Sequence, residues 1–511
     1  MKGKKIIILL TIIMVMLSFA ACGNSKETNN SNSSSENNQE TSADQNDSSV
    51  DSGNAEEDTD EADNARYQTS GKVTVAVNSG RTTDTYNLFA HFNDYYPNIE
   101  LNVVYYDVST SDYLSAQAAA GTMPDVVFDD ASQIYYYVSQ GWVYPLDDFV
   151  EGDEDFSYVP VSITDSYRYG GNLYALPMQA HFNSIFINLD LLDKLNMDLP
   201  DLDWTPEDYM DLLKSGTTNE YSGTEILWQI DEYLAGTIST DTGYYGYDPQ
   251  TRTFRTSDTW VQGVNIMREL RSYPGCEAWS LRNSNVDGDT SDYTRKFGNG
   301  DTSDLHMAFK MGKILTDPRG TWDVAWLKEL PYEWVLWPFP QGEDSPGRLP
   351  MHIDCSWVTS TAQNPQAAFE FVRFVTYSKE GNLERLAMYE TGDTDDYTLN
   401  EMFYIPTTNH PEVAEHFKNL ENVSESIAYM YDNMTNSFRA DLSKIVPGWD
   451  QVNNEYLSPR GNEVRDGIED AASVAAELDN VCTKAIQGYW NDFEETLSKV
   501  QSEFDSKNGS N

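Results

Sequence analysis

The fold is decided by residues 72–130, which read KVTVAVNSGRTTDTYNLFAHFNDYYPNIELNVVYYDVSTSDYLSAQAAAGTMPDVVFDD. Three β-rich runs in this stretch alternate with two stretches of helical character. In chain order we expect a strand at 72–77, a helix at 83–95, a strand at 99–105, a helix at 111–120 and a strand at 124–128. Short strands joined by helices form parallel sheets with right-handed crossovers. The sequence therefore predicts an α/β fold.

Polar residues follow two of these strands where each strand ends. Asn78 follows the first strand, and Asp129 and Asp130 follow the third. Ligands of parallel sheets bind beyond the carboxyl ends of the strands. We therefore expect these three residues to line a binding site, although Asp129 could instead cap the next helix.

Helix start and stop signals continue along the chain. Ser111 is placed to cap the second helix and Gly121 to end it. Thr205-Pro206 and Asn364-Pro365 open two further helices, the second running to Phe374. At 511 residues the chain exceeds what one core usually supports, and no linker or internal repeat interrupts residues 67–511. We expect two lobes joined by several crossings of the chain.

The charge of the chain limits its partners. There are 33 basic and 83 acidic residues, a net charge of −50, of which −43 falls on residues 67–511. Nucleic acid is excluded as a partner, because phosphate contacts need a surface rich in lysine and arginine. Aromatic residues make up 13% of the chain, which indicates a folded body and not a disordered one.

The first 66 residues are predicted to lie outside the folded body. Residues 1–21 form a signal peptide, with three lysines, an apolar run and small residues before Cys22. The order LSFAACG at 17–23 resembles a bacterial lipoprotein signal, in which Cys22 carries the lipid; the alternative is simple cleavage that leaves a free thiol. Residues 22–66 are polar and acidic, which is typical of a disordered tether.

Motifs for catalysis or cofactors are absent from the sequence. There is no Walker A loop, dinucleotide fingerprint, His-Glu-x-x-His pair or nucleophile elbow, so we expect no cofactor, no metal and no enzyme activity. Residues 283–294 loosely resemble a calcium loop but lack the acid at position twelve, and a polar loop is favoured. Spacing cannot pair Cys276, Cys355 and Cys482, and buried thiols are slightly favoured.

Seven segments together resemble the extracellular solute-binding proteins of family 1, the maltose and multiple-sugar type. They are FNDYYPNIE (92–100), AGTMPDVV (120–127), GWVYPLD (141–147), GNLYALP (171–177), FINLDLL (186–192), DWTPE (203–207) and PQAAFEF (365–371). The resemblance implies a two-lobed periplasmic-binding-protein-like fold with hinge strands around a ligand cleft.

The resemblance also implies where the lobes divide. The first lobe would hold about 67–177 and 325–375, and the second about 178–324 and 376–511. The strand from Tyr174 to Asn188 would cross between the lobes, and the region near Lys313–Pro338 would return. After about Thr376 the chain would finish on the second lobe.

Cleft residues are expected from the same resemblance, since relatives contact ligand from the ends of strands. Besides the residues after the first and third strands, these are Gln179, His181, Phe182, Lys313, Asp354 and Trp357. His181 stands where maltose binders carry a carboxylate. The alternative is that His181 is a structural histidine whose nitrogens are hydrogen-bonded within the protein. Sugar rings pack on aromatic side chains, which adds Trp228 and Trp322 as candidates, although core packing is the alternative for every tryptophan.

The function implied is that of a lipoprotein on the extracellular face of the cell membrane. It would capture a solute, a mono- or oligosaccharide, in the cleft between the lobes and deliver it to the permease of an ABC importer. Its membrane contact would be the lipid on Cys22. Two alternatives stay open: a secreted glycoside hydrolase, which needs two carboxylates at a fixed separation, and a lipoprotein that senses a ligand.

Overall fold

The computed structural model of the protein describes residues 65–79, 89, 91–129, 133–227, 229–282, 291–298, 306–391 and 405–508. The signal peptide, Cys22 and nearly all of the acidic tether lie outside these ranges. No helix within them is long and apolar enough to cross a membrane.

A parallel three-stranded unit begins the fold, as the sequence predicts. β1 (Gly71–Asn78) lies between β2 (Ile99–Tyr106) and β3 (Val126–Asp129), and Val75 pairs with both neighbours. Val75 is fully buried, and the other valines of β1 are buried with it. β3 is buried on both faces, with Val126, Val127 and Phe128 all buried, and for that reason it reads as a continuous apolar run, whereas β2 is buried only at Ile99 and Tyr106.

The helix α3 (Thr110–Ala120) leads from β2 to β3. The hydroxyl of Ser109 accepts a hydrogen bond from the N–H of Asp112 at 3.1 Å, so the cap lies two residues before the predicted Ser111. Gly121 ends the helix with φ 69°, a left-handed conformation that glycine adopts without strain. The predicted end of this helix is therefore confirmed.

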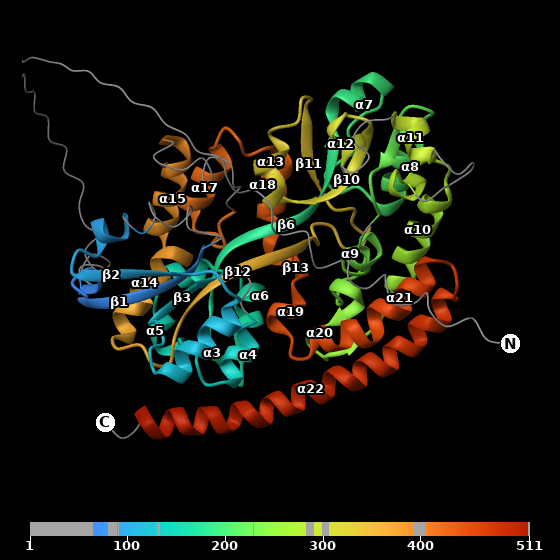
Figure 1. Cartoon of the computed structure of the whole chain (residues 1–511). Coiled ribbons are helices and arrows are strands. Elements are labelled where there is room, and N and C mark those ends of the chain that lie inside the picture. The colour runs from blue at the N-terminus through green and yellow to red at the C-terminus, as the bar shows by residue number, and fades with distance from the viewer. Residues whose placement is uncertain are drawn as a thin grey trace, which may run out of the picture. The chain divides into compact units, whose positions relative to one another are not determined.

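The long strand β6 (Leu176–Asn188) connects two parts of the sheet, and all 13 of its residues are buried. Its residues 176–182 pair with the antiparallel strand β12 (Pro350–Val358), which also pairs with β3. These strands, with β1, β2 and β13 (Phe438–Arg439), form the first half-sheet. Figure 1 shows β6 running from this half-sheet into the other.

The second half-sheet is built on the remaining residues of β6, 183–188. They pair with β10 (Ile314–Gly320) on one side and β11 (Trp334–Pro338) on the other, and β7 (Ser222–Thr224) pairs with β10. The region near Lys313–Pro338 thus stays in the second half-sheet, and the predicted return there is wrong. The chain returns along β12, because β12 is the one strand of the described ranges that pairs with both β3 and β6.

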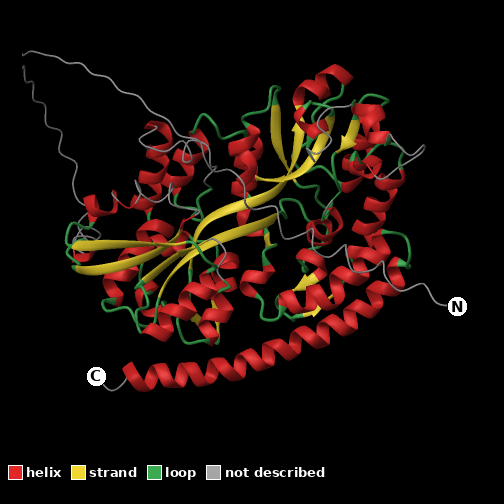
Figure 2. Cartoon of the chain, in the orientation of Figure 1, coloured by secondary structure: helices red, strands yellow, loops and turns green. Residues whose placement is uncertain are grey.

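Helices flank both half-sheets (Figure 2). On the first, α14 (Pro365–Thr376) packs against β12, β6 and β1, and on the second, α8 (Pro206–Gly216) packs against β7 and β10. The predicted caps of both helices are confirmed: Thr205 forms a capping box with Asp208, and Asn364 caps α14.

The other α-helices used below are α4 (Ile134–Ser139), α6 (Val161–Thr164), α7 (Leu189–Leu195), α9 (Ile230–Thr237), α10 (Trp260–Ser272), α11 (Asp292–Phe297), α15 (Lys379–Thr391), α17 (Pro411–Asn419), α19 (Leu442–Ile445) and α22 (Ala471–Asn508).

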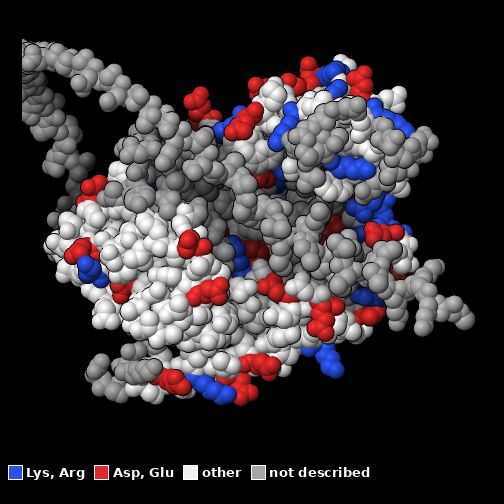
Figure 3. Space-filling view, viewed as in Figure 1, with Lys and Arg blue, Asp and Glu red and all other residues white. Residues whose placement is uncertain are grey.

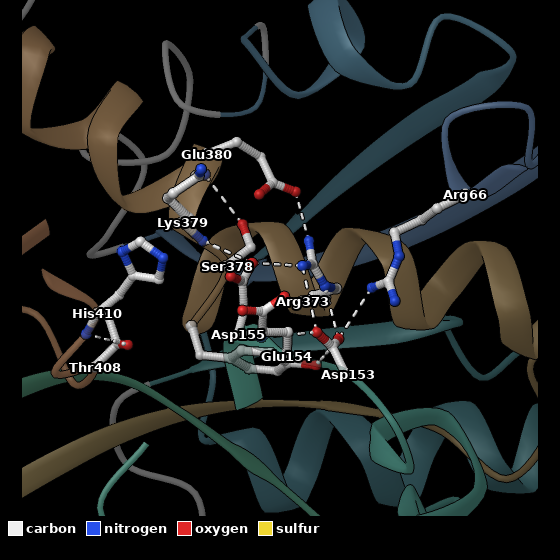
Figure 4. Close-up of polar contacts among 12 residues, drawn as sticks. Arg66, Asp153, Glu154, Asp155, Arg373, Ser378, Lys379, Glu380, Thr408 and His410 are labelled. Atoms are coloured by element: carbon white, nitrogen blue, oxygen red, sulfur yellow. Dashed lines mark hydrogen bonds and ion pairs between the residues drawn. The ribbon is translucent and has the colours of Figure 1, made fainter. Parts of the chain in front are cut away.

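A buried group of charges fixes the C-terminal end of α14 (Figure 4). Arg373, whose side chain is 5% exposed, donates to Asp153 at 2.8 Å and also pairs with Asp155 and Glu380. Arg66 donates to the same Asp153 at 3.0 Å, so the prediction that the disordered tether extends to residue 66 is wrong at its end, because this ion pair holds Arg66 in the folded body. Burial by itself raises the pKa of Asp153, but the charge and hydrogen bonds of Arg373 outweigh burial and hold this pKa below its usual value.

The chain after α14 does not finish wholly on the second half-sheet, so the prediction for residues after Thr376 is wrong in part. The helix α15 packs against α14, and α17 packs against α15, which places both with the first half-sheet. The physical reason is the charge cluster, because Glu380 of α15 is one of the partners of Arg373.

The C-terminal helix α22, of 38 residues, contacts both parts of the molecule (Figure 1). In its first half, Thr483 accepts a hydrogen bond from the N–H of Phe254 at 2.8 Å, next to α10. In its second half, the ring of Phe504 lies 5.0 Å from that of Tyr144, and the helix packs on α4. One helix therefore links the elements of the two half-sheets.

The three cysteines of the described chain, Cys276, Cys355 and Cys482, are buried and form no disulfide there. Burial raises the pKa of Cys276 to about 11 and that of Cys482 to about 12, so both thiols are protonated at neutral pH.

Candidate functional site

Four polar side chains meet where β6 and β12 pair. His181 lies opposite His352, and Gln179 lies opposite Asp354. Alternate residues of a strand point to the same face, so all four side chains share one face of the sheet. Together with Trp322 they are called the crossing site below.

Hydrogen bonds order the crossing site. The Gln179 amide donates to Asp354 Oδ2 at 3.0 Å and lies 3.0 Å from Nε2 of His181. Since the amide nitrogen can only donate, His181 Nε2 accepts, and the proton of a neutral His181 sits on Nδ1. That nitrogen faces the hydroxyl of Thr321 at 3.5 Å, and the same hydroxyl accepts from the N–H of Phe182 at 3.1 Å.

A lysine balances the charge of Asp354. Lys444, from the helix α19, donates to Asp354 Oδ1 at 3.1 Å and lies 3.4 Å from Asp441. Burial lowers the pKa of Lys444, but the two carboxylates outweigh burial and the pKa is raised. Lys444 therefore stays charged in a buried place, where its contacts with Asp354 and Asp441 offset the cost of burying the ammonium.

His352 is the one member of the crossing site with a buried side-chain nitrogen that has no hydrogen-bond partner among the described residues. Burial lowers its pKa to about 4, although the charge of Asp441 acts in the opposite direction. The ring is thus neutral at pH 7, and its buried Nε2 has no hydrogen-bond partner in the part of the chain that the structure describes. Such a nitrogen is costly to leave unpaired, so it is a natural contact for a ligand or a water.

Trp322 supplies the apolar surface of the crossing site. Its side chain is 38% exposed, and its ring centre lies 5.1 Å from that of His352 and 5.9 Å from that of His181. Gly320 makes this position possible, because a Cβ there would lie 2.2 Å from the indole. An exposed aromatic ring beside buried hydrogen-bonding groups is the usual composition of a small-molecule site.

A second polar cluster, which was not predicted, lies where β7 and β10 end. Arg319 pairs with Asp317 at 2.6 Å and with Glu225 at 3.3 Å, and His306 lies 2.7 Å from Glu225. Burial raises the pKa of Asp317 well above its usual value, although the Arg319 charge opposes it. The adjoining Gly320 pairs with Asn183 of β6, so this cluster borders the crossing of the chain.

Three predicted residues do not fit the site. Phe182 and Trp357 are fully buried in the core, because both point to the face opposite the polar residues beside them in the strands. Lys313 directly precedes the first residue of β10, whereas Gly320 is the last residue of that strand. The two residues are therefore about 20 Å apart along the strand. Its ammonium lies 4.9 Å from the ring centre of Tyr221.

The other predicted residues are placed at strand ends or lie outside the described ranges. Asn78 is the half-buried last residue of β1, and Asp129 is the last residue of β3, with its backbone opposite Cys355. Asp130 and Trp228 lie outside the described residues, as do 283–290 of the weak calcium loop. Within the described ranges, no three His, Cys, Asp or Glu side chains are arranged to hold a metal.

Sequence analysis did not predict three residues in or beside the crossing site. His352 stands two residues before Asp354, so the alternation of β12 could have found it. Thr321 directly precedes Trp322 and could have been found with it. Lys444 offered no signal, because its contact with Asp354 joins positions 90 residues apart.

Comparison with known proteins identifies the fold. Residues 87–393, more than half of the chain, match the family model described as "Bacterial extracellular solute-binding protein". MalE of Xanthomonas citri, a sugar-binding protein, has a similar structure, with a TM-score of 0.61, 13% identity and coverage of 85% of this chain and 99% of that one. The ABC substrate-binding protein Lmo0181 of Listeria monocytogenes, solved in complex with cycloalternan, is also similar. Its TM-score is 0.59 and its identity 16%, over 82% of this chain and 100% of that one.

The GacH receptor of Streptomyces glaucescens, solved unliganded and with acarbose, is also similar, with a TM-score of 0.58 and 16% identity over 83% of this chain and 100% of that one. These likenesses confirm the two-lobed α/β fold predicted from the sequence. With the family model covering residues 87–393, they lead to one conclusion: the chain belongs to the bacterial extracellular solute-binding proteins.

Proposed function

We propose that this protein captures an extracellular carbohydrate at the crossing site and delivers it to the permease of an ABC importer. The observation that supports this most is the position of Trp322, whose exposed ring borders the buried polar groups of His181 and His352. A pyranose needs both features, because its C–H face packs on an aromatic ring while its hydroxyls need hydrogen-bond partners.

The two half-sheets are the cores of the two lobes in this proposal. The first lobe carries α14, α15 and α17, and the second carries α7, α8 and α10. β6 and β12 are the crossings between them, so the crossing site lies at the base of the cleft. Binding shifts the lobes toward a closed arrangement, because only that arrangement lets both lobes contact the solute.

The protein is anchored, in the same proposal, by a lipid on Cys22, and residues 23–64 hold the lobes away from the membrane. The charge of −43 on residues 67–511 favours docking on basic loops of the permease. On the face shown in Figure 3, most lysine and arginine side chains lie over the second half-sheet and its helices. On this face the two lobes therefore differ in their charge patterns. Replacing Cys22 with serine should release the protein from the membrane fraction; an unchanged membrane fraction would refute the lipid anchor.

The solute is tested with purified protein and a panel of neutral mono- and oligosaccharides, amino acids and peptides. A sugar at a hundred times its dissociation constant should add about 2.7 kcal/mol to the free energy of unfolding, which appears as a higher unfolding temperature. Stabilisation by amino acids or peptides alone would refute the carbohydrate. Release of shorter sugars during the incubation would favour the glycoside hydrolase instead.

A further inference from the structure

A cavity of about 950 Å³ lies apart from the crossing site. Its walls come from α6 and the residues after it, from the loops 240–255 and 344–348, from β13 and α19, and from Trp490 of α22. None of the five residues of the crossing site is among its described lining residues. Its volume falls within the range of about 300–1,000 Å³ found for small-molecule sites.

Arginine is concentrated in the wall of this cavity, although the chain as a whole is strongly acidic. Four of the arginines have a carboxylate partner within the described chain. These pairs are Arg168–Asp147 at 2.7 Å, Arg252–Glu494 at 2.6 Å, Arg255–Asp258 at 2.9 Å and Arg439–Asp441 at 2.7 Å. We refer to the whole space as the arginine cavity.

Arg348 differs from these four, because no carboxylate pairs with it among the described residues. Its guanidinium donates to three backbone carbonyls: Nε to Gly236 at 3.1 Å, Nη2 to Thr242 at 2.8 Å and Nη1 to Asn436 at 3.4 Å. These bonds fix the group in place but do not neutralise its charge. Burial lowers the pKa of Arg348, and the more distant Asp241 offsets this only in part.

An arginine has five N–H donors, and the three carbonyls account for three of them. The remaining N–H groups and the unneutralised charge suit a carboxylate, which arginine binds through two parallel hydrogen bonds. A partly buried cation without an anion is costly, so an anionic ligand would remove that cost.

The acidic side chains among the described residues of the wall do not neutralise the charge of Arg348. Asp248 accepts hydrogen bonds from the residues of its own turn, and Asp241 lies 3.4 Å from Arg255. Asp165 lies 3.8 Å from Arg168 and is 63% exposed to solvent. The fourth acid, Asp344, lies in the loop before Arg348.

Trp490 gives the cavity an apolar side. The guanidinium of Arg252 lies 3.8 Å from the centre of its ring, and the indole N–H donates to the hydroxyl of Tyr247 at 3.3 Å. The ring is thereby held in position at the wall, where it can contact the carbon skeleton of a ligand.

We propose that the arginine cavity is a second binding site and takes a small organic carboxylate held by Arg348. The site is separate from the carbohydrate site, and only its coupling to the closing of the lobes rests on the proposed function. Its walls come from both lobes, with α6 and Arg168 on the first and Arg252, Arg255 and Arg348 on the second. A carboxylate that contacts both walls fits one arrangement of the lobes better than others, so its binding is coupled to the movement that closes the cleft.

The test uses the purified protein with citrate and glucuronate as probes, and with glucose as the uncharged counterpart of glucuronate. Isothermal titration should give a dissociation constant below about 1 mM for citrate or glucuronate. A dissociation constant well above that value would mean that binding is too weak to matter. Arg348→Gln should weaken binding at least tenfold, and Arg295→Gln, on the exposed surface of α11, should not change it. To control for screening, the unfolding temperature with each carboxylate is compared with that in sodium chloride at the same ionic strength.

Binding of neither carboxylate would overturn the proposal, as would equal binding by the Arg348→Gln protein. If that variant does not fold, Arg255→Gln, at a side chain 39% exposed, should weaken binding of the same probes, and no loss there would overturn the proposal. Neutral sugars report on the crossing site and carboxylates on the arginine cavity, so failure of one proposal is distinguishable from failure of the other.

Discussion

The indole of Trp322 meets the imidazole of His352 at a ring-centre distance of 5.1 Å, with the two planes at 64°. This contact joins the two lobes, because Trp322 follows a strand of the second half-sheet and His352 lies on the strand that returns to the first. Any change in the angle between the lobes therefore changes the surroundings of both rings.

Removal of the Trp322 ring should abolish most of the affinity for the solute. An aromatic contact contributes about 0.5–1.5 kcal/mol beyond the area it buries, so we expect Trp322→Ala to weaken binding by tenfold or more, measured by isothermal titration. Trp322→Phe should retain much of the affinity. Tyr273→Ala is the control, because Tyr273 is 39% exposed and lies at the end of α10. Equal affinities for Trp322→Ala and the native protein would refute the site.

The protein should lose stability as the pH falls from about 6.5 to about 4, in part because of His352. Its pKa is lowered to about 4 in the fold, against about 6.5 for an exposed histidine. Below pH 6.5 the unfolded chain therefore binds a proton that the folded chain does not, and stability decreases until the pH reaches the folded pKa.

We expect His352→Gln to reduce this loss by roughly 2 kcal/mol between pH 7 and pH 4.5. Urea unfolding at the two pH values measures the difference. A variant that loses as much stability as the native protein would show that His352 is not protonated on unfolding.

Loss of Arg373 should be severe, since it would leave three carboxylates close together in a buried place. Asp153, Asp155 and Glu380 all pair with this side chain, which is 5% exposed. Breaking a buried pair typically costs about 3–5 kcal/mol, so Arg373→Met should lower the urea midpoint strongly. Arg295→Met removes an exposed pair and should change stability by less than about 0.5 kcal/mol. Similar midpoints for the two variants would contradict the role assigned to the cluster.

Gly488 lies between the two halves of α22, and no atom outside the helix lies within 4 Å of the position a Cβ would take. Replacing a glycine in an exposed helix interior with alanine should stabilise the protein by roughly 0.5–1 kcal/mol, and proline should cost about 3 kcal/mol. Differential scanning calorimetry measures both. Stabilisation by Gly488→Pro would mean that the helix is not continuous at this point.

The sequence predicted those parts of the fold that depend on local signals. Gly121 ends α3 because only its left-handed conformation closes the helix, and Thr205 caps α8 with its own neighbour, Asp208. Such contacts join residues close in the chain, so their pattern is visible without knowledge of the fold. Gln179 and His181, two residues apart on one strand, lie 3.0 Å apart at their side chains, and their contact with a ligand stays a prediction.

The parts that were missed depend on pairing between distant segments. β11 pairs with the second part of β6, and nothing in its own residues distinguishes that partner from the first half-sheet. Phe182 was included with His181 although adjacent residues of a strand face opposite sides, an error that alternation alone could have prevented. The contact of Lys444 with Asp354 could not be predicted, because it depends on where the C-terminal region folds back.

The attachment of the helix α22 to both lobes has a mechanical consequence for closure. The helix is attached to both lobes, so any rotation of one lobe against the other must bend it, and the elastic energy of that bending is added to the free energy of closure. If bending costs about 1.4 kcal/mol in the closed form, the apparent affinity for the solute falls tenfold. Substitutions along α22 that make it stiffer or softer would then tune uptake without altering any residue that touches the solute.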